Sequence, residues 1–222
     1  MTFYNNEKKI LSFLGQLSNK EKSFFIFEDC FIEFINEFNS KLKKNINLKL
    51  FPDLSALVFW SRNQNIKNIK NKYYKDDLRV GVGIIFHITP ANMPLNFVYS
   101  YFVGLLTGNL NIVRLPSKNY TQIKVVLKIL KKLLSKKKYN KIKKLTYFIQ
   151  YDHVLNENIT KNISSICDLR VIWGGDESIF NIRQIPIQSK SREITFNDKY
   201  SITVINSNKI IKLNQSELFN LV

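Results

Sequence analysis

The decapeptide HITPANMPLN, residues 87–96, is the stretch of the sequence best suited to chemistry. It contains a histidine, two prolines and two asparagines, and it directly follows the apolar run 80–86. Its polar side chains could donate and accept hydrogen bonds at a ligand, although the same composition is typical of an ordinary surface turn. The elements around it must decide between these two interpretations.

From residue 79 onward, strands are predicted to alternate with helices. Nearly every residue of 79–88 is apolar, as in a strand covered on both faces. Further strands are predicted at 111–115, 145–150, 169–173 and 200–206, and helices at 95–106, 120–136, 154–165 and 176–184. This alternation predicts a doubly wound α/β fold with a mainly parallel sheet. Ligands bind at the carboxyl ends of such strands, so residues 87–96 lie where a site is expected.

The residues before this fold are predicted to be helical. An apolar stripe at helical spacing, typical of a core-facing helix, consists of Phe24, Phe27, Phe31, Phe34, Ile35 and Phe38. Pro52 and Asp53 are predicted to open a short helix that runs to Trp60, whereas residues 63–77 look like a linker or a surface hairpin. We therefore divide the chain into a helical region (1–78), an α/β domain (79–206) and the start of a truncated element (207–222).

The composition indicates a globular protein with a strong positive charge. Hydrophobic residues make up 45% of the chain and aromatic residues 13%, which excludes a disordered protein. The net charge of +17 invites a nucleic-acid interpretation, and eight lysines gather in residues 131–144. However, arginine is sparse, and abundant Lys, Asn and Ile are typical of a biased genome. We favour a solvated basic face and do not expect a nucleic-acid partner.

Several familiar motifs are missing from the sequence. The segment GVGIIF has Phe86 where a dinucleotide fingerprint needs its third glycine, and no Walker loop, zinc motif or nucleophile elbow occurs. Cys30 and Cys167 lie far apart, so we expect no metal site and a reducing, cytoplasmic setting. We expect no signal peptide. Polar residues and prolines interrupt the apolar region 80–106, so no membrane span is expected either.

Three segments in one order and spacing resemble a known family. FHITPANMPLN, GLLTGNLNIVRLPSKN and VIWGGDESIFNIRQIP are similar to the acyl-CoA reductases typified by the fatty acid reductase of bacterial luminescence operons. That family is a branch of the aldehyde dehydrogenase superfamily, whose cofactor domain is a variant of the Rossmann fold. The resemblance covers residues 79–206 well and residues 1–78 poorly.

The resemblance implies a role for Asn92 and for three residues at or just after the end of the second strand. Asn92 matches an amide that stabilises an oxyanion, a role suited to a fixed neutral donor; the alternative is an asparagine that only satisfies its turn. Arg114 matches a cationic position at the adenosine ribose. Ser117 replaces a glutamate common in NAD-preferring members, and Lys118 follows it. Because a cation suits a 2′-phosphate, we expect NADP(H) as the cofactor, although Arg114 and Lys118 could be plain exposed charges.

The resemblance also implies that Gly174 and Gly175 form a turn beside the cofactor pyrophosphate, where helix amides attract anions. It adds Thr89 and Pro90 to the cofactor-binding residues. Trp173 could pack or line the nicotinamide pocket. We interpret His87 as a hydrogen-bonded structural residue, and we assign no role to His153.

The implied reaction is NADPH-dependent reduction of a fatty acyl-CoA to the aldehyde. It needs a cysteine nucleophile from a second domain, and neither cysteine of this chain matches it, so the chain alone is not expected to turn over. We expect an acyl-CoA or acyl-enzyme donor, a homo-oligomer or a missing C-terminal domain, and an exposed apolar face. The alternatives are a reductase from another branch of the superfamily and a non-catalytic basic module that binds nucleic acid or a partner.

Overall fold

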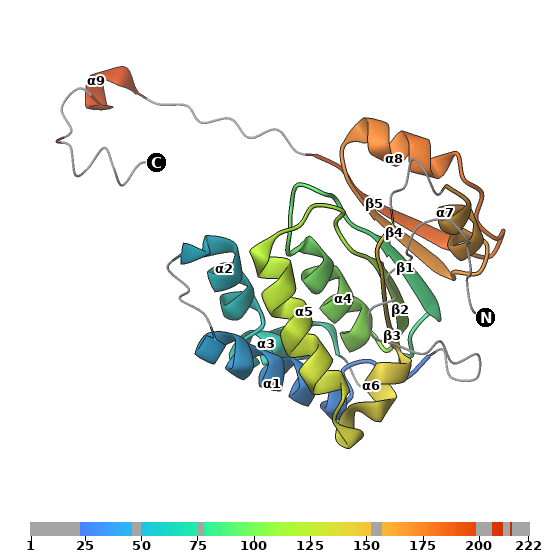
Figure 1. The fold of residues 1–222 in the computed structure, drawn as a ribbon, viewed down its shortest axis with the longest axis horizontal. Coiled ribbons are helices and arrows are strands. Elements are labelled where there is room, and N and C mark those ends of the chain that lie inside the picture. Colours follow the sequence, from blue (N-terminus) through green and yellow to red (C-terminus); the bar gives the residue numbers. More distant parts are fainter. Residues whose placement is uncertain are drawn as a thin grey trace.

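The computed structural model describes residues 23–45, 50–74, 78–151, 157–198, 206–210 and 214 (Figure 1). The elements in these residues are, in chain order, α1 (Asp29–Asn45), α2 (Pro52–Trp60), α3 (Asn63–Tyr73), β1 (Ile84–Ile88), α4 (Asn96–Leu106), β2 (Leu110–Arg114), α5 (Thr121–Leu134), the short 3-10 helix η2 (Lys137–Tyr139), α6 (Asn140–Lys144), β3 (Thr146–Ile149), α7 (Glu157–Ser164), β4 (Leu169–Trp173), α8 (Asp176–Arg183), β5 (Arg192–Phe196) and α9 (Ser207–Ile210).

A parallel sheet of five strands forms the centre of this part of the chain (Figure 1). The strand order is β3-β2-β1-β4-β5. β1 therefore lies between β2 and β4, with Phe86 opposite Ile112 on one side and Arg170 on the other. Every residue of β1 and β2 is buried, as expected of central strands covered on both faces. The predicted doubly wound α/β fold is confirmed.

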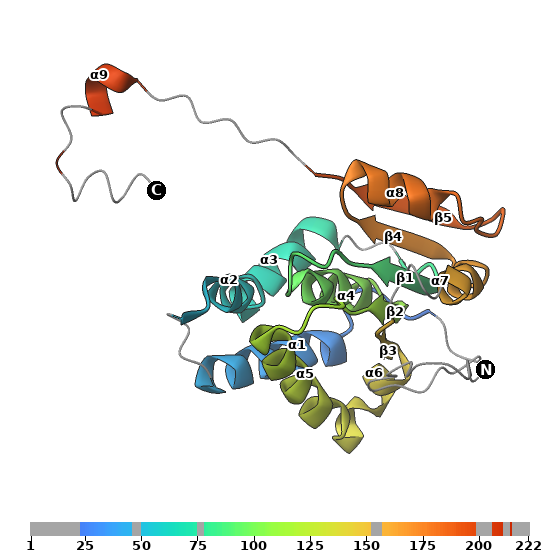
Figure 2. The same cartoon turned by 45° about the horizontal axis from the view of Figure 1, so that its top comes forward.

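Helices cover both faces of the sheet. Figures 1 and 2 show α4 and α5 against one face, with α1, α2 and α3 outside them, and α7 and α8 on the opposite face. The strand order explains this arrangement, because right-handed crossovers that leave β1 and β4 in opposite directions place their helices on opposite faces. Among the described helices, none is both long and apolar enough to cross a membrane. The predicted division at residues 78 and 206 stays a prediction.

The predicted phenylalanine stripe faces the core. Phe34 lies edge-on to Tyr139 and Phe38 lies edge-on to Phe102, each with ring centroids 5.1 Å apart. Such pairs contribute about 0.5–1.5 kcal/mol beyond the burial of their area. Phe24 is partly buried and precedes α1, while the fully buried members of the stripe are Phe31, Phe34, Ile35 and Phe38. The stripe thus holds α1 against α4 and the segment around η2.

The prediction of a linker or hairpin at residues 63–77 was wrong. Residues 63–73 form α3, while residues 75–77 lie outside the described residues. Ile66 is fully buried and Ile69 packs against the core. Two isoleucines three positions apart are too short a pattern to reveal a helical period among so many polar residues. Contacts of α3 with α1 and α2 supply the stabilisation that a short polar helix lacks on its own.

The first strand begins later than predicted. β1 starts at Ile84 instead of Arg79, and both Val80 and Val82 are exposed. Gly83 has a φ of 128°, which interrupts the extended backbone just before β1. A Cβ at Gly83 would also approach Asp168 Oδ2 to 2.2 Å. The apolar run in the sequence therefore extends beyond the strand that it predicts.

The fifth strand of the sheet is Arg192–Phe196 and not the predicted segment 200–206, of which the structure describes only Asn206. β5 is mostly exposed and carries charges, so it lacks the apolar run of an inner strand. A partly buried ion pair joins β5 to β4 between the register partners Arg170 and Glu193. Arg170 Nε donates to Glu193 Oε2 at 2.7 Å, and Arg170 Nη1 donates to the Ile185 carbonyl oxygen at 2.8 Å. Because Arg170 is buried, removal of Glu193 would leave the charge of Arg170 uncompensated.

Part of the lysine cluster at 131–144 is paired within the molecule. Lys136, Lys138 and Lys141 form ion pairs with glutamates of α1 or of the residue before it. Burial raises the pKa of Glu37, but hydrogen bonds from Lys136, Tyr139 and Lys138 outweigh it and lower this pKa to about 2. These lysines therefore hold α1 and the residue before it against the segment from Lys136 to Lys141.

We expect Glu37→Gln to reduce the acid sensitivity of the fold. The folded pKa of about 2 lies below the ordinary value of 4.5, so ionised Glu37 stabilises the folded state fully above about pH 5 and progressively less as the pH falls toward 2. Urea titrations across this range should show the variant about 1–2 kcal/mol less stable than wild type at pH 6, with a gap that closes near pH 2. The exposed Glu177→Gln serves as the control, and a gap independent of pH would contradict the assignment.

Candidate functional site

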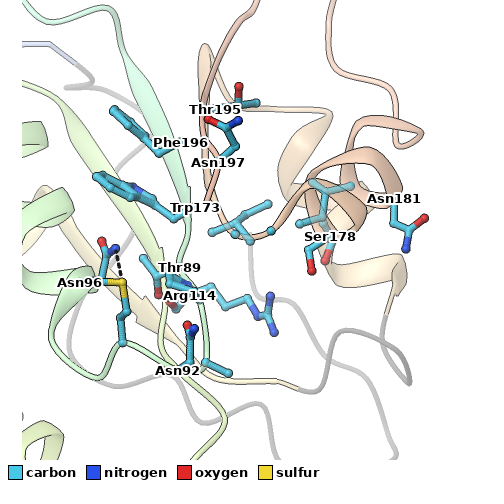
Figure 3. A pocket seen from close by; sticks show the side chains of 18 of the residues that line it. Thr89, Asn92, Asn96, Arg114, Trp173, Ser178, Asn181, Thr195, Phe196 and Asn197 are labelled. Carbon is cyan, nitrogen blue, oxygen red and sulfur yellow. Dashed lines mark hydrogen bonds between the residues drawn. The ribbon is translucent and has the colours of Figure 1, made fainter. Parts of the chain in front are cut away.

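A cleft of about 1070 Å³ opens at the carboxyl ends of the strands (Figure 3). It lies where β1 and β4 are neighbours, which is the point at which the strand order reverses. The chain leaves β1 toward α4 on one face of the sheet and leaves β4 toward α8 on the other, so the two strand ends part and leave space between them. The cleft is thus a direct product of the topology.

Every residue that the sequence predicted for the site lines this cleft. The set comes from the loop after β1, from the end of β2 with the turn that follows, and from the turn between β4 and α8. In chain order it is Thr89, Pro90, Asn92, Arg114, Ser117, Lys118, Gly174 and Gly175. The shared location is a finding, while the role of each residue stays a prediction.

The loop after β1 is held in place while leaving Asn92 accessible. Thr89 Oγ1 donates to the Arg114 carbonyl oxygen at 2.8 Å, and Tyr120 Oη donates to the Ala91 carbonyl oxygen at 3.3 Å. Asn92 is exposed on the cleft wall, and its side chain forms no hydrogen bond with the residues that the structure describes (Figure 3). A turn-satisfying role for Asn92 therefore has no hydrogen bond to support it, and the amide can meet a ligand.

The end of β2 brings positive charge to the cleft. Arg114 is buried, and its guanidinium carbon lies 5.2 Å from the centre of the Tyr151 ring. Figure 3 shows its side chain extending into the cleft. Ser117 and Lys118 follow in an exposed turn, in which Gln150 Nε2 donates to the Pro116 carbonyl oxygen at 2.8 Å. A fixed buried cation and an exposed one thus share the same side of the site, an arrangement suited to a phosphate group.

The turn between β4 and α8 has little room for a side chain at Gly175. Gly175 is the N-cap of α8 with φ −68° and ψ 161°, a conformation open to any residue. A Cβ at Gly175 would approach Asp198 Oδ2 to 2.9 Å, whereas one at Gly174 would meet Ser178 at 3.4 Å. The Asp198 carboxylate thus lies close against Gly175, and the Gly174 backbone N–H donates to the Phe196 carbonyl oxygen at 3.2 Å. Acidic Asp176 in the first turn suits the helix dipole.

A buried chain of hydrogen bonds supports the cleft from behind. His87 Nε2 donates to Asn111 Oδ1 at 3.0 Å, because Asn111 uses its amide nitrogen to donate to the Asn109 carbonyl oxygen. His87 Nδ1 must then accept, and Ser100 Oγ donates to it at 2.7 Å. Burial lowers the pKa of His87 to about 4, although the bond to Asn111 opposes this shift. His87 is neutral at pH 7, and its interpretation as a structural residue is confirmed.

Trp173 connects the hydrogen bonds of His87 and Ser100 to the cleft wall. Its indole nitrogen donates to Ser100 Oγ at 3.3 Å, and its ring stacks on Phe196 with centroids 3.9 Å apart and an interplanar angle of 13° (Figure 3). Sequence reasoning missed Phe196 and its neighbours because β5 was assigned to another segment. The cleft residues missed in and after this strand are Thr195, Phe196, Asn197 and Asp198. The alternation in REITF was the one signal that could have revealed them.

Neither cysteine lies in the cleft wall. Cys167 is fully buried, and burial raises the pKa of its thiol to about 11, so it is a poor thiolate. Cys30 is partly buried beside Glu28, to which its thiol donates at 3.6 Å. The described residues contain no group of three or more His, Cys, Asp or Glu side chains that could hold a metal ion. His153 lies outside them.

Comparison with protein families decides what the chain is related to. The model of the acyl-CoA reductase family (LuxC) matches residues 29–218, which is most of the sequence. The chain belongs to the acyl-CoA reductase family. The resemblance inferred from the three motifs is therefore confirmed, and the match extends further toward the N-terminus than those motifs do. No curated protein matches the sequence of this family member.

Solved aldehyde dehydrogenases share the fold of this acyl-CoA reductase family member. Glyceraldehyde-3-phosphate dehydrogenase GapN of Methanocaldococcus jannaschii, complexed with NADP, is 16% identical with a TM-score of 0.56, over 77% of this chain and 41% of that chain. Lactaldehyde dehydrogenase of Escherichia coli is 10% identical with a TM-score of 0.56, over 75% and 39%. A betaine aldehyde dehydrogenase double mutant of Staphylococcus aureus, in complex with NAD⁺, is 14% identical with a TM-score of 0.54, over 76% and 37%.

These structural similarities show that the chain shares its fold with part of each aldehyde dehydrogenase. The chain spans about two fifths of the length of each of these three dehydrogenases.

We expect Ser100→Ala to loosen the indole of Trp173. The substitution removes the acceptor of the indole N–H and the donor to His87, at a cost in stability of about 1–3 kcal/mol. Trp60→Phe leaves Trp173 as the only tryptophan of the chain, so time-resolved fluorescence anisotropy in that background should show larger local motion of Trp173. Ser135→Ala, on the exposed end of α5, is the control. Unchanged anisotropy would mean that stacking on Phe196 alone holds the ring.

Proposed function

We propose that the complete protein catalyses the NADPH-dependent reduction of a fatty acyl-CoA to its aldehyde, and that this chain is its cofactor-binding part. The observation that carries the proposal is that all eight residues assigned through the family resemblance line one cleft at the strand-order reversal. Family membership supports the reaction class, and the shared fold of NAD- and NADP-bound aldehyde dehydrogenases supports a nicotinamide cofactor.

The cleft residues fit a phosphorylated dinucleotide. The buried cation Arg114 and the exposed Lys118 line the cleft at and after the end of β2, and position 117 carries a serine instead of a carboxylate. A carboxylate there would repel a 2′-phosphate, and a cation attracts it. Gly174 and Gly175 line the cleft just before α8, and the backbone amides at a helix N-terminus suit a pyrophosphate. These features support NADP(H) over NAD(H).

The roles of the residues in the reaction follow from the same arrangement. A bound nicotinamide cofactor supplies the hydride. Asn92 donates through its side-chain amide to the oxygen that gains negative charge when a thiolate attacks the acyl thioester. The thiolate itself is expected from a second domain, because Cys30 and Cys167 lie away from the cleft. Thr89 and Pro90 shape the loop that carries Asn92.

We also propose an acyl-CoA or acyl-enzyme donor and a cytoplasmic location. A second domain or another copy of the chain is proposed to cover the apolar side chains that β5 leaves exposed. Ile194 is 45% exposed and Phe196 is 43% exposed, which supports such a cover near the cleft. The ion pairs of Lys136, Lys138 and Lys141 with acidic side chains reduce the charge that the lysine cluster could offer to a nucleic acid.

We expect the 222-residue chain to bind NADPH more tightly than NADH, as measured by calorimetry. Lys118→Glu should weaken NADPH binding by about tenfold and leave NADH binding nearly unchanged, because it reverses the charge that meets the 2′-phosphate. Lys128→Glu, with the same charge change on an exposed position of α5 outside the cleft, is the matched control. Equal affinity for both nucleotides would contradict the NADP preference, and binding of neither by a folded chain would remove the support for a cofactor site.

A further inference from the structure

Asn96, the first residue of α4, has an unsatisfied polar atom beside the cleft. The residue is 6% exposed, and its side-chain oxygen is buried without a hydrogen-bond partner among the described residues. Its amide nitrogen meets the thioether sulfur of Met93 at 4.0 Å, which is a weak acceptor. A buried acceptor that the protein leaves without a hydrogen-bond partner costs free energy.

Other buried asparagines of the same region are well satisfied. Asn109 accepts from the Gly83 backbone N–H and donates to the carbonyl oxygens of Gly104 and Thr107. Asn111 accepts from His87 and donates to the backbone. The fold therefore has the means to satisfy buried amides around α4 and β2, and Asn96 stands out because the protein gives it no such partner.

The position of Asn96 makes a ligand the natural partner. The residue lines the cleft, and Figure 3 shows it near Trp173 and Thr89, on the same wall as Asn92. Met93, which also lines the cleft, is 55% exposed. An exposed and unbranched methionine side chain can move aside at little cost, and its movement would open the Asn96 amide to the cleft.

The chemistry of a primary amide defines the group that it would bind. Asn96 offers one acceptor oxygen and one donor nitrogen. A primary amide satisfies both through two complementary hydrogen bonds, and a secondary amide satisfies one of them. We infer that Asn96 is a ligand-binding residue of the cleft whose side chain pairs with an amide of the bound ligand. This inference rests on the proposed function, because the two sources of such a group are the carboxamide of the nicotinamide ring and the amides of the pantetheine arm of coenzyme A.

The test compares Asn96→Leu with wild type in stability and in binding. Leucine removes the unsatisfied amide, so the urea midpoint of the variant should equal or exceed that of wild type. NADPH binding should weaken by about tenfold, as expected for loss of a paired polar group. Binding of the reduced 3-acetylpyridine analogue, which has no carboxamide N–H, should change much less. Titration with coenzyme A forms the second arm and detects recognition of the pantetheine amides.

Asn36→Leu is the matched control. Asn36 lies on α1, outside the cleft wall, and its side-chain oxygen is also buried without a hydrogen-bond partner among the described residues. Its replacement should leave the binding of both nucleotides and of coenzyme A unchanged. A loss of binding in this variant would mean that leucine substitutions disturb the cleft from a distance, and would overturn the assignment to Asn96.

The remaining outcomes separate the inference from the proposed function. A clear loss of stability in Asn96→Leu would make Asn96 a structural residue and overturn the inference. If the variant bound NADPH and coenzyme A with wild-type affinity, the inference would also be overturned, while the cofactor proposal would stand. If wild type bound neither nucleotide but bound coenzyme A in an Asn96-dependent way, the cofactor proposal would fail and the pantetheine amide would be the partner. If wild type bound none of these ligands, both would fail.

Discussion

The reversal of strand order between β1 and β4 is the constraint on which the rest of the structure depends. Right-handed crossovers carry the chain from these two neighbours to opposite faces of the sheet, so nothing fills the space beyond their carboxyl ends. The loop after β1, the end of β2 and the turn before α8 all border that space. Short polar segments far apart in the sequence thus become one site without any long loop.

A cleft open at its rim needs a rigid wall behind it, and the hydrogen-bond chain from Trp173 through Ser100 and His87 to Asn111 provides one. It joins β4, α4, β1 and β2, and its members Ser100, His87 and Asn111 are buried. This series of hydrogen bonds requires a neutral imidazole at His87 and a very close approach of α4 to the sheet. Gly104 permits that approach, since a Cβ there would lie 2.0 Å from Asn111 Oδ1.

Charge is distributed unevenly over the molecule. In the cleft, Arg114 and Lys118 lie at the end of β2, whereas Asp198 lies against the glycine turn before α8. A ligand with separated anionic groups would therefore meet attraction on the first side and, on the second, the N-terminus of α8 beside an acid. Elsewhere, lysines after α5 meet acidic side chains of α1. Much of the net charge of +17 nevertheless stays on the surface, where salt screens it.

The sequence by itself determined the fold class, the inner strands and the turn segments that border the cleft. Apolar runs and helical periods are local signals, and they are strong where an element is buried on both faces, as in β1 and β2. The sequence patterns of α3 and β5 are weak because each element is mostly exposed. Packing on α1 stabilises α3, and the Arg170–Glu193 pair stabilises β5. Only the tertiary structure decided that Phe196 stacks on Trp173 and that Asn96 lacks a partner, because both facts depend on contacts between segments that sequence periodicity does not relate.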